Sequence, residues 1–274
     1  MKKFENIMIA SDLDGTFFSS STEEVPRNIE RIKYFTENGG LFTFATGRVA
    51  AHLMTRLAGA HEYVNFPAVT CNGMVLFDIA TRREIEEHFS DTDKVMETVR
   101  FLGSRYEGLG YRAHTRDGVI YFQPDNPYIK REIRTSRMPT KYVPFEKWKE
   151  EKIYKLTFRA DAETLACVKR ELEEAFPGVY TISLSWVDLL ETQPYGRSKA
   201  SMLADIKESF LREGREIKLY AVGDYENDLE MLGMADVAVC PANAIDSVKQ
   251  VCDLCLCDND TGVIADLIDY LDRS

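Results

Sequence analysis

Short apolar runs alternate with amphipathic stretches over the first part of the chain. Three short runs, apolar apart from Thr43 and Thr70, lie at residues 7–10, 41–45 and 67–70. Continuous runs of this length are typical of strands that are buried on both faces. Pro26 opens a stretch with apolar residues at helical spacing, and this stretch ends at Gly39 and Gly40. Strands and helices in alternation predict a parallel sheet that helices cover on both faces.

The pattern changes between residues 84 and 189. Strand-like runs there come in pairs, at 111–115 with 119–123 and at 179–184 with 187–190. Such pairs indicate hairpins of a second sheet. Helical stretches accompany them at 93–106 and 162–176, and a Pro- and Arg-rich connection separates the two halves. We therefore predict a core domain of residues 1–83 and 190–274, with an α+β domain of residues 84–189 inserted into it.

The alternation of predicted strands and helices resumes after this insertion. The predicted elements are a helix at 198–213, a strand at 217–222, a short helix at 227–232, a strand at 237–239 and a final helix at 263–271. The run 251–257 contains Cys252, Cys255 and Cys257. We predict a short buried strand with structural thiols there, because free cysteine is commonly buried. The chain as a whole is predicted to be an α/β protein with a doubly wound parallel sheet and an inserted domain.

Composition and charge narrow the classes of function. The chain has 274 residues, 45% of them hydrophobic, and a net charge of −11, which is typical of a globular protein. Phosphate backbones favour Lys- and Arg-rich faces, so this charge argues against nucleic acid as a partner. No apolar run is long enough to span a membrane, and the first residues lack a signal-peptide core. We therefore expect a cytoplasmic protein without a membrane partner.

Polar side chains stand at the ends of predicted strands and at the starts of predicted helices. These residues are Asp12 and Asp14 after the first strand, Thr46 and Gly47 after the second, Lys199 in the helix after the insertion, and Asp224, Asn227 and Asp228 after a late strand. In an open α/β sheet, ligands bind in the crevice at the carboxyl ends of the strands. These segments, far apart in the chain, are therefore predicted to form one site.

The residue types in this site suit phosphoryl transfer. A carboxylate such as Asp12 can attack phosphorus and form an acyl phosphate, and Asp14 can protonate the leaving oxygen and later activate water. Mg²⁺ prefers carboxylates and water together with phosphate oxygens, which makes Asp12, Asp224 and Asp228 candidate ligands. The Thr46 hydroxyl, neighbouring backbone N–H groups such as that of Gly47, and the Lys199 ammonium can stabilise negative charge on the phosphoryl oxygens.

Four motifs, taken together, resemble those of the haloacid dehalogenase (HAD) superfamily. They are Asp12-Leu13-Asp14-Gly15-Thr16, Thr46-Gly47-Arg48, Lys199, and Gly223-Asp224-Tyr225-Glu226-Asn227-Asp228. Their order, with a large insertion between the second and the third, is similar to the Cof-type branch with a C2B cap. The resemblance implies a Rossmann-like core with an α+β cap domain. It also implies a phosphatase that acts on sugar phosphates or related phosphorylated metabolites.

The same resemblance implies a role for each matching residue. Asp12 is the expected nucleophile and Asp14 the expected general acid and base. Mg²⁺ is expected on the Asp12 carboxylate, the Asp14 backbone carbonyl and Asp224, with support from Asp228 through water. Thr46 and Lys199 are expected to hold the phosphoryl group. Asn72 and Asn227 are expected to lie around the phosphate or the cap entrance, and Thr16 is expected to stabilise the first loop.

Two departures from the family pattern leave the expected catalytic groups intact. Ala200 stands where relatives usually have glycine after the motif lysine. The segment Cys240-Pro241-Ala242-Asn243-Ala244 replaces the more usual Ala-Met-Gly-Asn-Ala ending. The second departure lies in a loop that we expect near the site, so it can alter the geometry there.

Two other functions are compatible with the same residues. A phosphomutase or another phosphotransferase would use the same Asp12 intermediate and pass the group to a hydroxyl. A non-catalytic module that binds phosphorylated metabolites would keep the fold without turnover, but it has no need for a nucleophile. Within the insertion, Arg112, His114, Arg131, Arg134 and Arg137 are expected to form a solvated face, which is the usual environment of such residues.

Overall fold

The computed structural model describes residues 2–135 and 138–273, and the chain divides into two compact units. Unit 1 comprises Met1–Thr46, Leu57–Glu86 and Ser198–Ser274, and unit 2 comprises Gly47–Arg56 and Glu87–Arg197. Arg137 lies outside the described residues. Within the described ranges, no helix is both long enough and apolar enough to cross a membrane.

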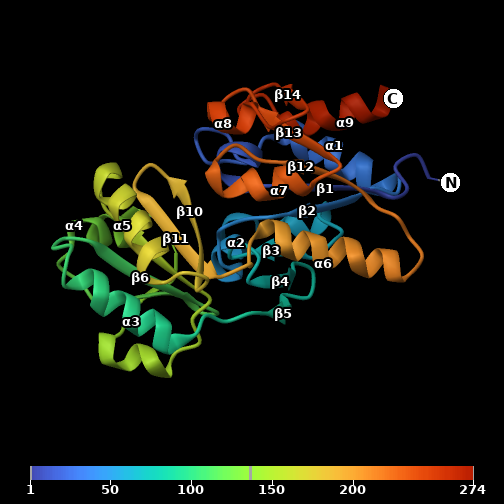
Figure 1. The fold of residues 1–274 in the computed structure, drawn as a ribbon. Coiled ribbons are helices and arrows are strands. Elements are labelled where there is room, and N and C mark those ends of the chain that lie inside the picture. The colour runs from blue at the N-terminus through green and yellow to red at the C-terminus, as the bar shows by residue number, and fades with distance from the viewer. Residues whose placement is uncertain (1, 136–137, 274) are drawn as a thin grey trace. The chain divides into compact units, whose positions relative to one another are not determined.

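Unit 1 is built on a parallel five-stranded sheet (Figure 1). In spatial order its strands are β14 (Leu254–Leu256), β13 (Val237–Pro241), β12 (Lys218–Val222), β1 (Ile7–Ser11) and β2 (Leu41–Phe44). A bridge between Ala45 and Val69 leads from β2 to a three-stranded sheet. That sheet comprises β3 (Ala68–Thr70), β4 (Val75–Asp78) and β5 (Arg83–Glu87).

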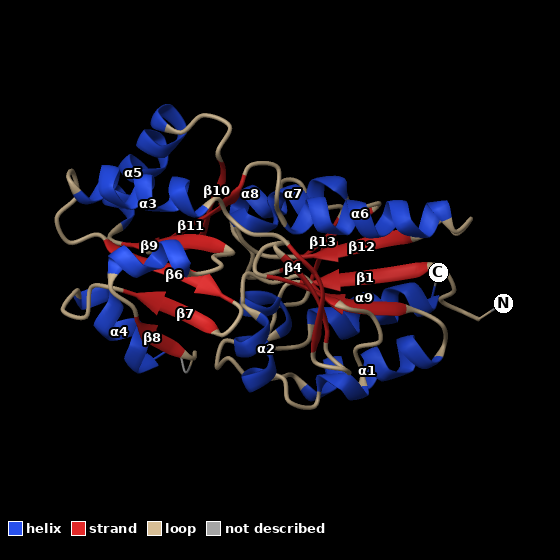
Figure 2. Ribbon diagram, turned by 90° about the horizontal axis from the view of Figure 1, so that it is seen from below, coloured by secondary structure: helices blue, strands red, loops and turns tan. Residues whose placement is uncertain are grey.

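Helices cover both faces of the parallel sheet (Figure 2). The helices of unit 1 are α1 (Pro26–Glu37), α6 (Lys199–Arg212), α7 (Leu229–Met234), α8 (Asp246–Lys249) and α9 (Val263–Arg273), with short helical turns η1 (Leu13–Phe17), η2 (Ala60–Glu62) and η4 (Glu226–Asp228). Alternate residues of β1 point to opposite faces, so Met8 and Ala10 pack against Met202 and Ile206 of α6. The predicted α/β class with a parallel sheet is therefore confirmed.

Unit 2 contains a six-stranded, mostly antiparallel sheet (Figure 2). In spatial order its strands are β10 (Tyr180–Trp186), β11 (Leu189–Pro194), β9 (Lys155–Arg159), β6 (Gly110–Thr115), β7 (Gly118–Tyr121) and β8 (Thr140–Tyr142). Its helices are α2 (Ala50–Arg56), α3 (Thr92–Gly103), α4 (Pro127–Thr135) and α5 (Ala162–Ala175), with the turn η3 (Phe145–Glu150). One face of the sheet packs against α3 and α5 in an apolar core that includes Trp148.

Three local expectations were wrong. The helix after Thr46 begins only at Ala50, so Thr46 is not at its N-terminus. The Pro- and Arg-rich connection, in which no element was expected, contains α4 and β8. The Asn126 side chain accepts hydrogen bonds from two backbone N–H groups and caps α4, which buries little besides Ile129. The strand near residue 254 lies at the edge of its sheet, and Cys255 is exposed.

Candidate active site

The predicted residues of unit 1 follow neighbouring strands of the parallel sheet. Asp12 comes directly after β1, Asp224 follows β12 by two residues, and Thr46 follows β2 by two residues. The Asp12 N–H donates to the Val222 carbonyl oxygen over 2.8 Å, which holds the start of this loop against the end of β12. Because β12, β1 and β2 are adjacent and parallel, their carboxyl ends lie at one edge of the sheet.

Lys199 joins two of the carboxylates. Its Nζ lies 2.6 Å from Asp12 Oδ1 and 2.7 Å from Asp228 Oδ1, and all three side chains are buried. Ser198 caps α6 by accepting the Ser201 N–H, which fixes Lys199 as the first residue of that helix. Asp228 Oδ2 in turn accepts the N–H groups of Asp224 and Tyr225 over 3.0 and 3.2 Å. The ammonium is therefore held in place by groups from three segments of unit 1.

The loop after Asp12 is tied to Asp224. Thr16 Oγ1 donates to Asp224 Oδ1 over 2.6 Å. Gly15 has a φ of +79°, and a Cβ at this position would lie 2.3 Å from Asp224 Oδ2. Only glycine combines this backbone conformation with so close an approach. The Asn243 side chain donates to the Gly15 carbonyl oxygen over 2.7 Å, which attaches the loop to the segment after β13.

Burial dominates the electrostatics of the carboxylates. Burial raises the pKa of Asp12 well above its usual range, although Lys199 acts in the opposite direction; Asp228, Asp224 and Asp14 raise it further. Burial, with Asp228 next, raises the pKa of Asp224 to about 7. Burial lowers the pKa of Lys199, but Asp12 and Asp228 together bring it above its ordinary value. The cluster therefore holds more negative charge than Lys199 alone neutralises.

This excess of negative charge suits a divalent cation. One carboxylate oxygen from each of Asp12, Asp224 and Asp228 lies within 4.8 Å of the other two. Hard cations prefer such oxygen ligands, and a bound cation would offset the like-charge repulsion that raises the pKa of Asp12 and Asp224. The donor set therefore fits a divalent metal.

A strained turn places Asn72 beside Thr46. The Asn72 N–H donates to the Thr46 carbonyl oxygen over 2.9 Å, and the Thr46 N–H donates to Val69. Cys71, Asn72 and Gly73 all have positive φ. A Cβ on Gly73 would lie 2.0 Å from the Ser198 carbonyl oxygen, so this turn packs tightly against the start of α6. Thr46, Asn72 and Lys199 therefore belong to adjoining segments of unit 1.

The other predicted site residues have fewer contacts with the carboxylates and Lys199. Asp14 is half-buried and close enough to Asp12 and Asp224 to raise the pKa of both. Asn227 is half-buried in η4. Gly47 belongs to unit 2, where its carbonyl oxygen accepts a hydrogen bond from Lys155 Nζ over 2.7 Å. The structure thus gathers Asp12, Lys199, Asp224 and Asp228 most tightly.

Sequence reasoning missed the hydrogen bond from Asn243. Its only signal was the unusual Cys240–Ala244 segment, in which Asn243 follows β13 by two residues. That position sits at the same edge of the sheet as Asp12 and Asp224. A polar residue at a strand end is therefore a better indicator of a site residue here than agreement with the family ending.

Comparisons with known proteins agree with this geometry. The family model of haloacid dehalogenase-like hydrolases matches residues 9–268. The pyridoxal phosphate phosphatase YbhA of Escherichia coli is 26% identical over 287 residues, which covers 95% of this chain and 97% of that protein.

Solved structures share the fold at lower identity. SMU.1108c from Streptococcus mutans superposes with a TM-score of 0.85 at 21% identity, covering 97% of this chain and 99% of its own. The sugar phosphatase BT4131 of HAD subclass IIB has a TM-score of 0.83 at 19% identity, covering 98% of this chain and all of its own. The resemblance to the Cof-type branch, and with it the predicted enzyme class, is confirmed: the chain belongs to the haloacid dehalogenase-like hydrolases.

Proposed function

We propose that the protein is a Mg²⁺-dependent phosphatase that hydrolyses small phosphomonoesters through an aspartyl-phosphate on Asp12. The observation that carries this proposal is the buried Asp12 at the end of β1, with Lys199 Nζ at 2.6 Å and two further buried carboxylates beside it. A carboxylate that is costly to bury and is held by a cation is suited to attack on phosphorus.

Two half-reactions follow from these residues. A carboxylate oxygen of Asp12 forms a bond to phosphorus while the ester P–O bond breaks, and Asp14 gives its proton to the leaving oxygen. A water molecule then attacks phosphorus and gives a proton to Asp14, and the bond between Asp12 and phosphorus breaks. The products are an alcohol and inorganic phosphate, and both aspartates return to their starting state.

Binding groups lower the barrier by stabilising negative charge on the phosphoryl oxygens. We assign this role to the Lys199 ammonium and to Thr46, with Gly47, Asn72 and Asn227 as further substrate-binding residues. Asp12, Asp14, Asp224 and Asp228 would hold Mg²⁺, which supplies charge neutralisation on the phosphate oxygens when bound. Thr16 and Asn243 position the loop that carries Asp14.

The proposed substrate class is a small phosphorylated metabolite. Its support is the family assignment together with relatives named for such substrates, including the pyridoxal phosphate phosphatase and a 5-amino-6-(5-phospho-D-ribitylamino)uracil phosphatase, YwtE of Bacillus subtilis, at 25% identity. We propose that residues 84–189 form a cap domain that selects among these substrates and that 1–83 and 190–274 form the catalytic core.

A phosphate-release screen over many phosphomonoesters with Mg²⁺ tests this proposal. Wild-type protein should release inorganic phosphate, and Asp12→Asn should lower kcat by at least about 10⁴-fold, because the amide is not a nucleophile. Circular dichroism should show that the variant keeps its fold. Full activity in Asp12→Asn would overturn the mechanism, and turnover that requires a bisphosphate activator would indicate a phosphomutase instead.

A further inference from the structure

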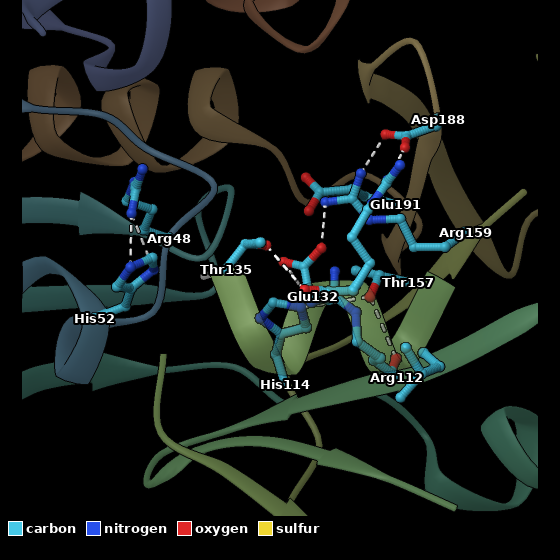
Figure 3. Close-up of polar contacts among 12 residues, drawn as sticks. Arg48, His52, Arg112, His114, Glu132, Thr135, Thr157, Arg159, Asp188 and Glu191 are labelled. Carbon is cyan, nitrogen blue, oxygen red and sulfur yellow. Dashed lines mark hydrogen bonds and ion pairs between the residues drawn. The ribbon is translucent and has the colours of Figure 1, made fainter. Parts of the chain in front are cut away.

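Two polar arrangements lie outside the carboxylate cluster, one in each unit. The first is the polar face of the unit 2 sheet, where Arg112 and His114 are each 3% exposed. Glu132 of α4 lies 2.9 Å from Arg112 and supplies its counter-charge within the unit (Figure 3). The expectation of a solvated face was therefore wrong for Arg112 and His114, whereas Arg131 and Arg134 are exposed as expected.

The second arrangement surrounds the turn η1 of unit 1, which carries Asp14. This is one wide turn, closed by the Phe18 N–H, which donates to the Leu13 carbonyl oxygen over 2.8 Å. Asp14 and Gly15 depart from helical geometry inside it, with a ψ of 119° at Asp14 and a φ of +79° at Gly15. Backbone carbonyl groups in such a turn lack the regular partners of a helix or a sheet, so they need partners from elsewhere.

Three asparagine side chains supply partners for carbonyl oxygens of this turn and of the residue after it. Each donates one hydrogen bond from its amide to a backbone carbonyl oxygen: Asn243 to that of Gly15 over 2.7 Å, Asn28 to that of Phe17 over 3.4 Å, and Asn259 to that of Phe18 over 2.8 Å. Asn28 belongs to α1, Asn243 follows β13, and Asn259 precedes α9. The turn is therefore attached to three separate segments of unit 1.

The same amides also accept hydrogen bonds from the C-terminal part of unit 1. Asn243 Oδ1 accepts the Asn259 N–H over 3.0 Å, and Asn28 Oδ1 accepts the Ala265 N–H in the first turn of α9 over 3.0 Å. A neutral amide can serve a carbonyl and an N–H at once, whereas a carboxylate only accepts. An amide also adds no negative charge beside the three carboxylates of the site. We call Asn28, Asn243 and Asn259 the asparagine network.

Asn243 is the member of the network that acts nearest to Asp14. The carbonyl group that it binds belongs to Gly15, the residue directly after Asp14. The next residue, Thr16, donates from its hydroxyl to Asp224 over 2.6 Å. One hydrogen bond thus holds each side of the peptide group between Gly15 and Thr16. Loss of the Asn243 side chain would release one of them.

Asp12 is held independently of the asparagine network. Its N–H donates to the Val222 carbonyl oxygen over 2.8 Å, and its carboxylate lies 2.6 Å from Lys199 Nζ. A change in the network should therefore alter the direction of the Asp14 side chain while the Asp12 side chain stays in place.

We propose that Asn28, Asn243 and Asn259 are positioning residues that hold η1 so that the Asp14 carboxyl meets the leaving oxygen of the substrate. This inference rests on the proposed function, in which Asp14 gives a proton to that oxygen. General acid catalysis contributes roughly 10²–10⁴-fold to a rate, and a misplacement of about 1 Å is enough to lose much of it. The network therefore matters for poor leaving groups, which need the proton, and much less for good ones.

Two substrates with similar rings separate this role from a general loss of structure. Benzyl phosphate has a poor leaving group that needs a proton, and p-nitrophenyl phosphate has a good one that does not. With saturating Mg²⁺, Asn243→Ala should lower kcat/KM by about 30-fold for benzyl phosphate and by at most about threefold for p-nitrophenyl phosphate. The value of kcat/KM covers the steps up to release of the alcohol, so slow hydrolysis of the aspartyl-phosphate does not affect it.

Asn65→Ala is the matched control. Asn65 lies in the same unit, donates to the Gly40 carbonyl oxygen over 2.9 Å and accepts the Phe42 N–H over 2.9 Å. These contacts lie at the amino end of β2, whereas Asp14 follows the carboxyl end of β1. The ratio of kcat/KM for the two substrates should therefore stay at its wild-type value in Asn65→Ala.

A double-variant cycle shows whether Asn243 acts through Asp14. In an Asp14→Asn background, where the side chain gives no proton, adding Asn243→Ala should lower kcat/KM for benzyl phosphate by less than about threefold. Equal losses with and without Asp14, or equal losses for the two substrates in Asn243→Ala, would overturn the positioning role and leave the phosphatase intact.

Further outcomes keep this inference apart from the proposed function. Asn259→Ala should show the same selective loss at a smaller size, and it decides the matter if circular dichroism shows that Asn243→Ala does not fold. Asp14→Asn without a selective loss on benzyl phosphate would overturn the inference, because the proton donor would then be another group. Absence of Asp12-dependent phosphate release from either substrate would overturn the proposed function itself.

Discussion

Each unit of the protein contains a buried cluster of charged side chains, and the two clusters differ in whether cations and carboxylates balance. In unit 1, Lys199 faces the carboxylates of Asp12, Asp224 and Asp228. In unit 2, three largely buried cations, Arg112, Lys155 and Arg159, pair with three carboxylates, Glu132, Asp188 and Glu191. An excess of buried charge is costly unless a ligand of opposite sign compensates it.

The difference separates a cluster that suits a ligand from one that is structural. The carboxylates of unit 1 suit a divalent cation and a nucleophilic role, and burial already raises the pKa of Asp224 to about 7. In unit 2, by contrast, the cations and carboxylates pair with each other, and the Lys155–Glu191 pair is complete within the protein. Buried charge alone therefore does not mark a site; incomplete pairing does.

The largest expected effect concerns the Lys155–Glu191 pair. Lys155→Met should lower the free energy of unfolding of unit 2 by about 3–5 kcal/mol, because it leaves the buried Glu191 carboxylate without its counter-charge. Trp148 and Trp186 are the two tryptophans of the chain and both lie in unit 2, so denaturation followed by tryptophan fluorescence reports on that unit.

Two further variants sharpen this measurement. Lys155→Met/Glu191→Leu should recover most of the lost stability, because an apolar pair replaces both charges. Lys94→Met removes an exposed ion pair with Glu97 and should cost less than about 1 kcal/mol. Equal costs for Lys155→Met and Lys94→Met would show that the Lys155–Glu191 pair is not structural.

Gly15→Ala should affect chemistry in unit 1 rather than stability in unit 2. The added Cβ would displace Asp224, so kcat/KM should fall by about 100-fold. Gly214→Ala is the matched control in the same unit: its φ of +77° is nearly that of Gly15, but nothing lies within 4 Å of the added Cβ. A similar loss of activity in both variants would assign the effect to backbone strain instead of Asp224.

The smallest expected effect is the pH dependence of the contribution that Glu132 makes to the free energy of unfolding. Burial raises the pKa of this carboxyl, but Arg112 and Arg159 together bring it below the ordinary value of 4.5. A lowered folded-state pKa stabilises the fold above the ordinary pKa, and this benefit is lost as the pH falls through the lowered value. The stability advantage of wild type over Glu132→Gln should therefore shrink in acid, on the order of 1 kcal/mol.

Tryptophan fluorescence unfolding at pH 7, 5, 4 and 3 measures that advantage. Wild type and Glu132→Gln should differ most, and by a constant amount, at the two higher pH values. An advantage that is as large at pH 3 as at pH 7 would contradict ionisation of Glu132 as its source.

The sequence predicted the unit 1 cluster well because strand ends and chain order determine it. Asp12 and Asp224 each follow an apolar run, and parallel strands place such positions at one edge. The hydrogen bond from Asn243 to Gly15 was missed, although Asn243 also follows a strand end, because attention went to the departure of this segment from the family ending. The roles of these residues and the domain boundaries at 83 and 190 stay predictions.

The burial of the unit 2 cluster was not predicted from the sequence, for a different reason. Arg112 and His114 alternate with apolar residues, which is also the pattern of a strand with one solvated face. Their burial depends on α4, which has few apolar residues and reads as an irregular connection, and on the segment near Gly47. Periodicity reports the apolar side of a strand and carries no information about what covers the polar side.

Trapping the phosphoryl group tests the central claim most directly. With p-nitrophenyl phosphate, whose leaving group needs no proton, Asp14→Asn should still form the intermediate but hydrolyse it slowly. Borohydride reduction of the acyl phosphate, followed by peptide mass spectrometry, should then find homoserine at position 12. Equal phosphoryl labelling of the double variant Asp12→Asn/Asp14→Asn, or a label on another residue, would contradict Asp12 as the nucleophile.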